Sequence, residues 1–122
     1  MKVVLLNFSG PVEKRLVQWL RENNMETTTL QTEEGKDLMV RMSDIAPDII
    51  LLNTVQTPRL VSTIQQFCDR FKSLIMIGLT DNYSRFIREK LIMAGLNEYM
   101  DINELVEKGP DHLRSFLLER DS

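Results

Sequence analysis

Short apolar runs alternate with longer segments of helical period along the sequence, and this alternation repeats about five times. Such an order of strands and helices is typical of an α/β fold built on a parallel sheet. The runs predicted to be strands are Lys2–Leu6, Thr27–Leu30, Ile49–Leu52, Leu74–Leu79 and Glu98–Met100. Three of them are apolar enough to be central strands that helices cover on both faces.

The segments between the strands carry apolar residues at helical spacing. The first helix starts near Pro11, a residue suited to the first helical position. We expect the second helix to end before Pro47 and the fourth to end at Gly95. The apolar stripes are Val12, Leu16, Trp19 and Leu20; Leu38, Met42 and Ile45; Leu60, Ile64, Cys68 and Phe71; Phe86 or Ile87 with Leu91 and Ala94; and Leu113, Phe116 and Leu117.

Right-handed crossovers between these elements predict a five-stranded doubly wound parallel sheet. The 122 residues suit one domain, residues 1–122. In sheets of this kind, ligands and reacting groups collect at the carboxyl ends of the strands. The residues at those ends are Asn7 and Phe8, Asn53, Thr80 with Asp81, and Asp101 with Ile102.

The composition narrows the function further. A net charge of -3 offers no positive field for a nucleic-acid backbone, which argues against direct nucleic-acid binding. The single Cys68 excludes an internal disulfide and fits a small core residue, and we expect His112 to lie at the surface. The amino-terminal apolar run is too short for a signal peptide, and no stretch is long enough to cross a membrane. We therefore expect a soluble, cytoplasmic protein with no membrane partner.

Three stretches occur in an order that resembles a known family. PDIILLN (residues 47–53) looks like a strand that ends on a phosphoacceptor, MIGLTDN (76–82) like a strand that ends on a hydroxyl residue, and AGLNEYM (94–100) like a run of AGADDYL type. Together they resemble the CheY-like receiver domains of two-component response regulators over nearly the whole chain. The resemblance implies the CheY-like, flavodoxin-like fold in a single receiver domain of bacterial-type signalling.

The resemblance also implies an active site in which a phosphoacceptor aspartate, two metal-binding acids, a lysine and a hydroxyl cooperate. This sequence departs from that set at most positions. Asn53 stands at the acceptor position, Asn7 and Phe8 at the acidic pair, and Ile102 at the lysine. Only Thr80 and Tyr99 match, as the hydroxyl and the aromatic residue of the family's switch pair.

These exchanges predict a degenerate pocket that is not phosphorylated at Asn53 and holds no metal or cofactor, since a carboxamide is not a competent nucleophile for an acylphosphate. A structural interpretation stands beside this one: Asn53 hydrogen-bonds neighbouring backbone at a strand end. For Thr80 and Tyr99 we favour structural packing, because without a phosphoryl group the switch pair has no evident driver.

The fourth helix carries several charged residues, and the resemblance implies a partner or homodimer face made by the fourth helix, the fifth strand and the fifth helix. Its candidate residues are Arg85, Arg88, Glu89, Tyr99 and Asp101. A solvated helix face is the alternative. Gly109 and Pro110 interrupt the last helical segment, which makes this face less certain.

The leading hypothesis is an atypical receiver, or pseudo-receiver, in two-component or phosphorelay signalling that binds itself or another protein and is not an enzyme. It could form the N-terminal part of a longer regulator. One alternative is a flavodoxin-like protein in which the NFSGP loop (residues 7–11) binds a phosphate or flavin at a helix N-terminus. Another is a phosphorelay through Asp81 or Asp101.

Overall fold

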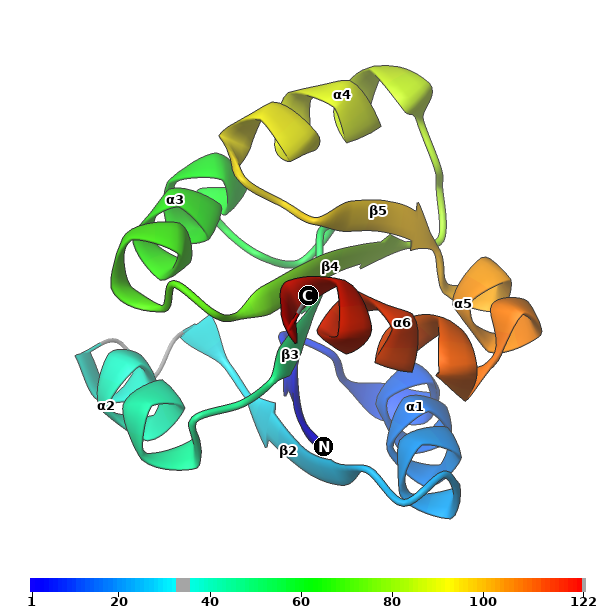
Figure 1. Ribbon diagram of the computed structural model, residues 1–122. Helices are drawn as coiled ribbons and strands as arrows, with labels where there is room; N and C mark the ends of the chain where they lie inside the picture. Colours follow the sequence, from blue (N-terminus) through cyan, green and yellow to red (C-terminus); the bar gives the residue numbers. More distant parts are fainter. Residues whose placement is uncertain (33–35, 122) are drawn as a thin grey trace.

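One sheet of five parallel strands forms the centre of the protein (Figure 1). The computed structural model describes residues 1–32 and 36–121. The spatial order of the strands is β2-β1-β3-β4-β5. Their bounds are β1 Lys2–Leu6, β2 Glu26–Leu30, β3 Ile49–Asn53, β4 Ile75–Thr80 and β5 Glu98–Asp101. The predicted five-stranded doubly wound sheet is confirmed, and every strand end lies within one residue of its expected position.

Six helices flank this sheet in the part of the chain that the structure describes. They are α1 Gly10–Glu22, α2 Lys36–Ile45, α3 Leu60–Arg70, α4 Arg85–Ala94, α5 Ile102–Lys108 and α6 Pro110–Asp121. Helices α1, α5 and α6 lie on one side of the sheet and α2, α3 and α4 on the other (Figure 1). None of the helices within residues 1–32 and 36–121 is long and apolar enough to cross a membrane.

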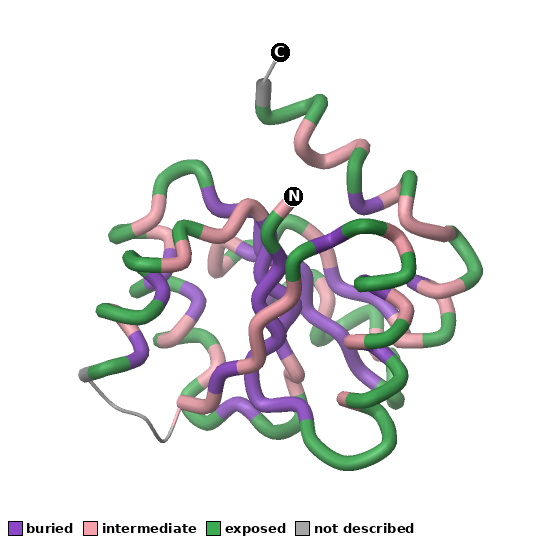
Figure 2. The backbone as a smooth tube through the Cα atoms, turned by 90° about the horizontal axis from the view of Figure 1, so that it is seen from below, coloured by how far each residue is buried: buried purple, intermediate pink, exposed green. Residues whose placement is uncertain are grey.

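Each face of the sheet has its own apolar core, because successive side chains of a strand point to opposite faces. Leu16 of α1, Leu105 of α5 and Leu113 of α6 pack against one face. Met42 of α2 and Ile64 of α3 pack against the other face. Figure 2 shows the strands as the buried centre of the molecule, with mostly exposed and half-buried residues around them. The three central strands are therefore covered on both faces, as their apolar sequences predict.

Helix α5 is the element that the sequence prediction missed. Asp101 begins it, since the Asp101 Oδ1 atom accepts a hydrogen bond of 2.8 Å from the backbone amide of Asn103. The helix has only seven residues and ends at Gly109, which has a φ of +84°, the left-handed region that favours glycine. Helix α6 then starts at Pro110. The interruption predicted at Gly109 and Pro110 is confirmed. It separates two helices, α5 and α6, where the sequence predicted only the helix after the break.

Several predicted core residues lie at the surface. Val12 in the first stripe is exposed, and so are both alternatives in the fourth helix, Phe86 and Ile87. The helical period of these segments is correct, but the buried stripe of α4 is narrower than expected and its one buried residue is Leu91. In α3 the prediction omitted Phe67, which is fully buried beside Ile64.

His112 differs from its expected position as well. It is half-buried in α6, its ring lies edge-on to Phe116 with 5.3 Å between ring centroids, and its Nε2 atom is buried. Within the described residues that nitrogen has no hydrogen-bond partner. His112 was expected at the surface because it follows the break at Gly109 and Pro110. Helix α6, which starts at the break, packs on the sheet through Leu113 and leaves His112 half-buried.

Candidate functional site

The ends of three adjacent strands meet at the carboxyl edge of the sheet. Asn7 follows β1, Asn53 is the last residue of β3, and Thr80 is the last residue of β4. The strands end at nearly the same level, because Leu6 pairs with Leu52 and Asn53 pairs with the residue before Thr80. The structure therefore brings together the strand-end residues that the sequence singled out.

A closed ring of three hydrogen bonds joins two of these strand ends. The Nδ2 atom of Asn53 donates to the backbone carbonyl of Asn7 at 3.1 Å, and the Nδ2 atom of Asn7 donates to the hydroxyl of Thr57 at 2.9 Å. The Thr57 hydroxyl in turn donates to the backbone carbonyl of Asn53 at 2.7 Å. We call these contacts the Asn7–Asn53–Thr57 ring. Every donor in it is neutral, so the ring needs no ion to hold it together.

The amide oxygens of the two asparagines bind backbone N–H groups outside the ring. The Oδ1 atom of Asn53 accepts from Val55 at 3.2 Å and from Gln56 at 3.3 Å, and the Oδ1 atom of Asn7 accepts from Thr32 at 2.9 Å. Asn7 has a φ of +64°, a conformation that asparagine tolerates better than most residues. These contacts are those expected of structural asparagines at strand ends, and they tie the β3–α3 loop and the segment after β2 to the same edge.

A surface cavity of about 310 Å³ lies beside the ring. Four apolar residues line part of it, namely Phe8, Val12, Val55 and Ile102. The other lining residues are Ser9, Asn53, Gln56 and Asp81. Phe8 is buried and also packs in the core below α1. Among the described residues that line this cavity there is no lysine or arginine, and Asp81 is the one carboxylate.

The residues at this edge do not fit the Mg²⁺ ion that the receiver fold implies. Mg²⁺ prefers carboxylate and water oxygens in octahedral geometry, whereas the two strand ends offer amides whose oxygens already accept backbone N–H groups. Asp81 is not part of a cluster of three histidine, cysteine, aspartate or glutamate side chains suited to a metal ion, since the described residues hold no such cluster. Ile102, at the position of the family's lysine, supplies no cation for a phosphoryl group.

Thr80 and Tyr99 are both buried, at 2% exposure each. The hydroxyl of Thr80 accepts a hydrogen bond of 3.0 Å from the backbone amide of Asn82, so it is used inside the β4–α4 loop. Tyr99 lies beside Gly78 in the register of β4 and β5, and its ring stacks on Tyr83 with 5.3 Å between the centroids. Both side chains are therefore packed inside the chain, and the structural role favoured for them from the sequence stays a prediction.

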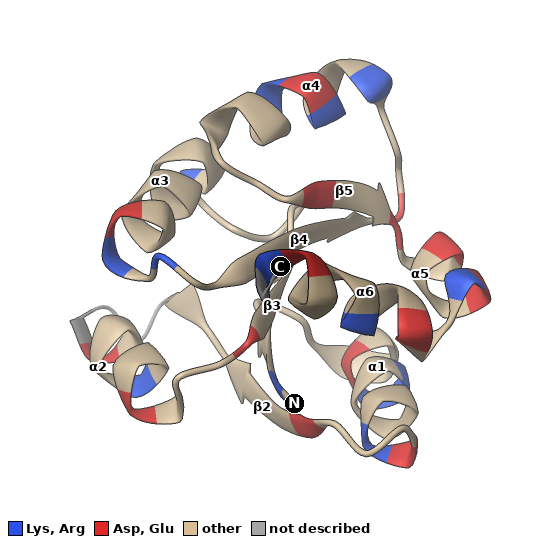
Figure 3. Cartoon of the chain, in the orientation of Figure 1, with Lys and Arg blue, Asp and Glu red and all other residues tan. Residues whose placement is uncertain are grey.

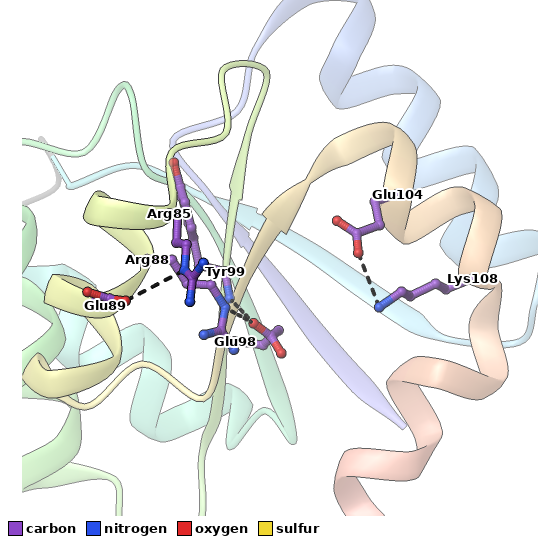
Figure 4. A network of polar contacts seen from close by, with 7 residues as sticks. All are labelled: Arg85, Arg88, Glu89, Glu98, Tyr99, Glu104 and Lys108. Carbon is purple, nitrogen blue, oxygen red and sulfur yellow. Dashed lines mark hydrogen bonds and ion pairs between the residues drawn. The ribbon is translucent and has the colours of Figure 1, made fainter.

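The candidate interface residues lie on α4 and β5 (Figure 4). Arg88 Nε and Glu98 Oε1 form an ion pair of 3.0 Å between helix and strand, and the same carboxylate oxygen accepts from the backbone amide of Tyr99 at 2.9 Å. The hydrogen bond to Glu98, together with its charge, raises the pKa of Arg88. Arg85 and Glu89 form an exposed pair of 3.8 Å along the helix. Arg88 thus already binds a carboxylate of the same chain, while the side chains of Arg85 and Glu89 are exposed to solvent.

Sequence reasoning missed three residues of this region. Thr57 closes the hydrogen-bond ring, Gly78 lies against the ring of Tyr99, and Tyr83 stacks on that ring. The polar stretch NTVQTP (residues 53–58) held a signal for Thr57, because a threonine four residues after a strand end can reach back to its carbonyl. Gly78 and Tyr83 gave no comparable signal, since their contacts join β4 and the β4–α4 loop to β5.

Comparisons with known proteins support the fold. No protein-family model and no curated protein sequence matches this chain. A putative response regulator from Chloroflexus aurantiacus is similar in structure, with a TM-score of 0.80, 15% identity and coverage of 96% of this chain and 97% of that one. An atypical orphan response regulator, described as having a phosphorylation-independent regulatory mechanism, has a TM-score of 0.73, 17% identity and coverage of 93% and 96%.

A third similar structure is the receiver domain of Ssk1 from Saccharomyces cerevisiae, solved in complex with the histidine phosphotransfer protein Ypd1. Its TM-score is 0.68 at 17% identity, and the match covers 84% of this chain and 78% of that one. At these sequence identities the three similarities show a shared fold. The five parallel strands, their order and these similarities together show that the chain has the CheY-like fold of response-regulator receiver domains.

Proposed function

We propose that this chain is an atypical receiver that signals by binding protein, either a partner or a second copy, without phosphorylation at Asn53. The observation that carries the proposal is the Asn7–Asn53–Thr57 ring. The ring uses the Asn53 amide nitrogen as a donor, and the amide oxygen accepts from the backbone of Val55 outside the ring. Both atoms are thus engaged at the place where a phosphoacceptor would need a free carboxylate. The proposal includes a non-enzymatic role, a cytoplasmic location and use as one domain of a two-component or phosphorelay-type regulator.

The surroundings of the ring support the same conclusion. Phosphoryl transfer depends on positioning and on neutralising the charge of the transferred group. The described residues that line the cavity beside Asn53 include no basic side chain, and the one acid among them, Asp81, would repel a phosphoryl group. The atypical orphan regulator with a similar structure is described as working independently of phosphorylation. We extend that description to this chain as part of the proposal.

The exposed surface of α4 is the binding face that we propose. Phe86 and Met93 are 74% and 88% exposed and lie seven residues apart, so they project from the same side of the helix. Helix α4 carries both basic and acidic residues and β5 carries acidic ones (Figure 3). Basic and acidic patches that lie side by side can pair with the same patches of a second copy related by twofold symmetry.

The first experiment is an amide-resolved NMR titration with Mg²⁺ and beryllofluoride, a phosphoryl mimic. We expect the amide resonances of Asn7, Asn53, Thr80, Tyr99 and Ile102 to stay unchanged at millimolar Mg²⁺. If Asn53, Thr80 and Tyr99 shift together, the pocket binds a phosphoryl-like group and the proposal is wrong.

Sedimentation velocity tests the binding face. If the chain associates with itself through α4, Met93→Glu should shift it to monomers at high micromolar concentration. Val40→Glu is the matched control, because Val40 is an exposed apolar residue of α2. This helix follows β2, which forms the opposite edge of the sheet from β5. Equal dissociation by both variants would contradict the α4 face, and a monomeric parent protein would leave only a different protein as partner.

Two alternatives stay predictions. A bound flavin at the loop of residues 7–11 would give the purified protein a visible absorption band. A phosphorelay through Asp81 or Asp101 would add the mass of a phosphoryl group after incubation with acetyl phosphate. Asp101 is the less suitable acceptor of the two, because its carboxylate caps α5.

A further inference from the structure

The missing side chain at Gly78 leaves room for the side chains of Leu96 and Thr54, and the ring of Tyr99 lies next to them. A Cβ atom at Gly78 would lie 2.8 Å from the Leu96 Cδ2 atom, 2.8 Å from the Thr54 Cγ2 atom and 3.4 Å from the Tyr99 Cδ2 atom. The first two distances are shorter than carbon atoms tolerate without moving. A glycine in the middle of a buried strand weakens the strand, so it marks a place where something approaches closely. Here the side chains of Leu96 and Thr54 approach the backbone, and the Tyr99 ring lies in contact distance of the same position.

Tyr83 stacks on this ring. The two rings stack with an angle of 21° between their planes. Tyr83 itself is 46% exposed, whereas Tyr99 is 2% exposed, so Tyr83 lies between Tyr99 and solvent. Stacked aromatic pairs contribute stability beyond the area they bury. Because Tyr83 comes two residues before α4, the stack also attaches the start of α4 to β5.

Polar contacts fix the backbone on both sides of the stack. Glu98 binds the backbone amide of Tyr99 and the side chain of Arg88, as Figure 4 shows. On the β4 side, Thr80 accepts from the backbone amide of Asn82 and Thr54 donates to the backbone carbonyl of Leu79 at 3.0 Å. All these partners lie within the chain, so the arrangement around Tyr99 needs no group bound at the strand ends.

We propose that Gly78 and Tyr83 hold Tyr99 in the buried position permanently, so that packing sets the α4–β5 surface whatever occurs at the strand ends. This inference rests on the proposed function and adds how the binding face is kept in one conformation. An equilibrium shifts only when a ligand binds two states differently. With the Tyr99 ring buried beside Gly78 and stacked on Tyr83, the alternative exposed state of the ring is removed from that equilibrium.

Fluorine NMR on protein labelled with meta-fluorotyrosine tests the proposal directly. The chain has two tyrosines, so two resonances are expected, and Tyr83→Phe assigns them. A soluble paramagnetic chelate should broaden the Tyr83 resonance strongly. We expect its effect on Tyr99 to be at least about tenfold weaker, because local opening is needed to expose a buried ring. Adding Mg²⁺ and beryllofluoride should leave the Tyr99 resonance unchanged.

Two variants should release the ring. Gly78→Val places branched carbons against Tyr99, and Tyr83→Ala removes the covering ring while leaving β4 intact. In both, the chelate effect on Tyr99 should rise severalfold, and Met93→Ala on the exposed side of α4 should change nothing. If the circular dichroism spectrum shows that Gly78→Val does not fold, the chelate experiment on Tyr83→Ala alone tests the proposal.

The inference is overturned if Tyr99 in the parent protein is as accessible as Tyr83, if Tyr83→Ala leaves it protected, or if beryllofluoride moves its resonance. The proposed function fails on a different reading, namely a shift of the Asn53 and Thr80 amides with the same reagent. If those amide resonances shift while the fluorine resonance of Tyr99 stays unchanged, the proposed function is rejected and the inference about Tyr99 stands.

Discussion

The side-chain amide of Asn53 donates a hydrogen bond of 3.1 Å to the backbone carbonyl of Asn7, and this contact joins the carboxyl ends of β3 and β1. A carboxylate in the same place could only accept, and the carbonyl opposite could only accept as well. The difference between asparagine and aspartate at position 53 is therefore a matter of stability as well as of chemistry.

Asn53→Asp should destabilise the fold and should not create a phosphoacceptor. We expect a loss of about 1–3 kcal/mol in the free energy of unfolding, the usual cost of leaving a buried polar group without its partner. Urea denaturation measures this loss, and the intact mass after incubation with acetyl phosphate and Mg²⁺ should stay that of the unmodified variant.

Asn82→Asp is the control for this prediction. It makes the same chemical change at an exposed position whose side chain has no hydrogen-bond partner among the described residues. Its free energy of unfolding should stay within about 0.5 kcal/mol of the parent value, as for most surface substitutions. If the Asn53→Asp protein is phosphorylated and its free energy of unfolding equals that of the parent, the structural role of the amide is contradicted.

Thr57 should matter as much as the asparagines. Its side chain is buried and relays the hydrogen bond from Asn7 to the carbonyl of Asn53. Thr57→Val keeps the shape but leaves the Nδ2 donor of Asn7 unpaired, while the Asn53 carbonyl keeps the backbone amide of residue 57 at 3.0 Å. We expect a loss of about 1–3 kcal/mol in the free energy of unfolding. Thr57→Ser keeps the hydroxyl and should cost about 1 kcal/mol or less, for the lost methyl group. Equal losses in the two variants would show that the hydroxyl is unimportant.

The sheet could be predicted from sequence because its strands are short apolar runs between helical segments. The run Ile49–Leu52, for example, has no polar residue and is fully buried in the structure. Helix α5 could not be predicted in the same way, because seven residues give less than two full turns of periodicity. The exposed side chains of α4 were also missed, since periodicity marks one apolar stripe but not how much of it a sheet covers.

The strand-end residues could be predicted from topology and from the resemblance, but their contacts could not. Asn7 and Asn53 are 46 positions apart in the sequence, and their hydrogen bond depends on the pairing of β1 with β3. Tyr99 was recognised as one of a pair with Thr80, whereas its close neighbours are Tyr83 and Gly78. Contacts between parallel strands link residues far apart in the chain, which local patterns do not report.

Gly95 offers a test of backbone conformation and packing together. It closes α4 with a φ of +123°, as the sequence predicts, and a Cβ atom there would overlap the Sγ atom of Cys68. Gly95→Ala should therefore lower the free energy of unfolding by about 1–3 kcal/mol or more, combining strain with the overlap. Chemical denaturation of both single variants and of the Gly95→Ala/Cys68→Ala double variant separates the two contributions.

Gly109→Ala is the matched control, because Gly109 also has a positive φ but no atom lies within 4 Å of its Cβ position. It should show the cost of backbone strain alone, about 1 kcal/mol. Replacing Cys68 should recover part of the loss at Gly95 and none at Gly109. Additive effects of Gly95→Ala and Cys68→Ala would mean that the two residues do not compete for space.

The thiol of Cys68 should be slow to react. Its pKa is raised from the usual 9.0 first by burial and then by the charge of Asp69, while Lys72 lowers it. Since the thiolate is the reactive form, the rate of alkylation by iodoacetamide should rise with pH around a midpoint above that of the urea-unfolded chain. Asp69→Asn removes the neighbouring negative charge and should move the midpoint of the folded protein downward, and Asp37→Asn on α2 should leave it unchanged. A folded midpoint at or below the unfolded one would show that the thiol is open to solvent, and the contact of Cys68 with Gly95 would then be looser than the structure indicates.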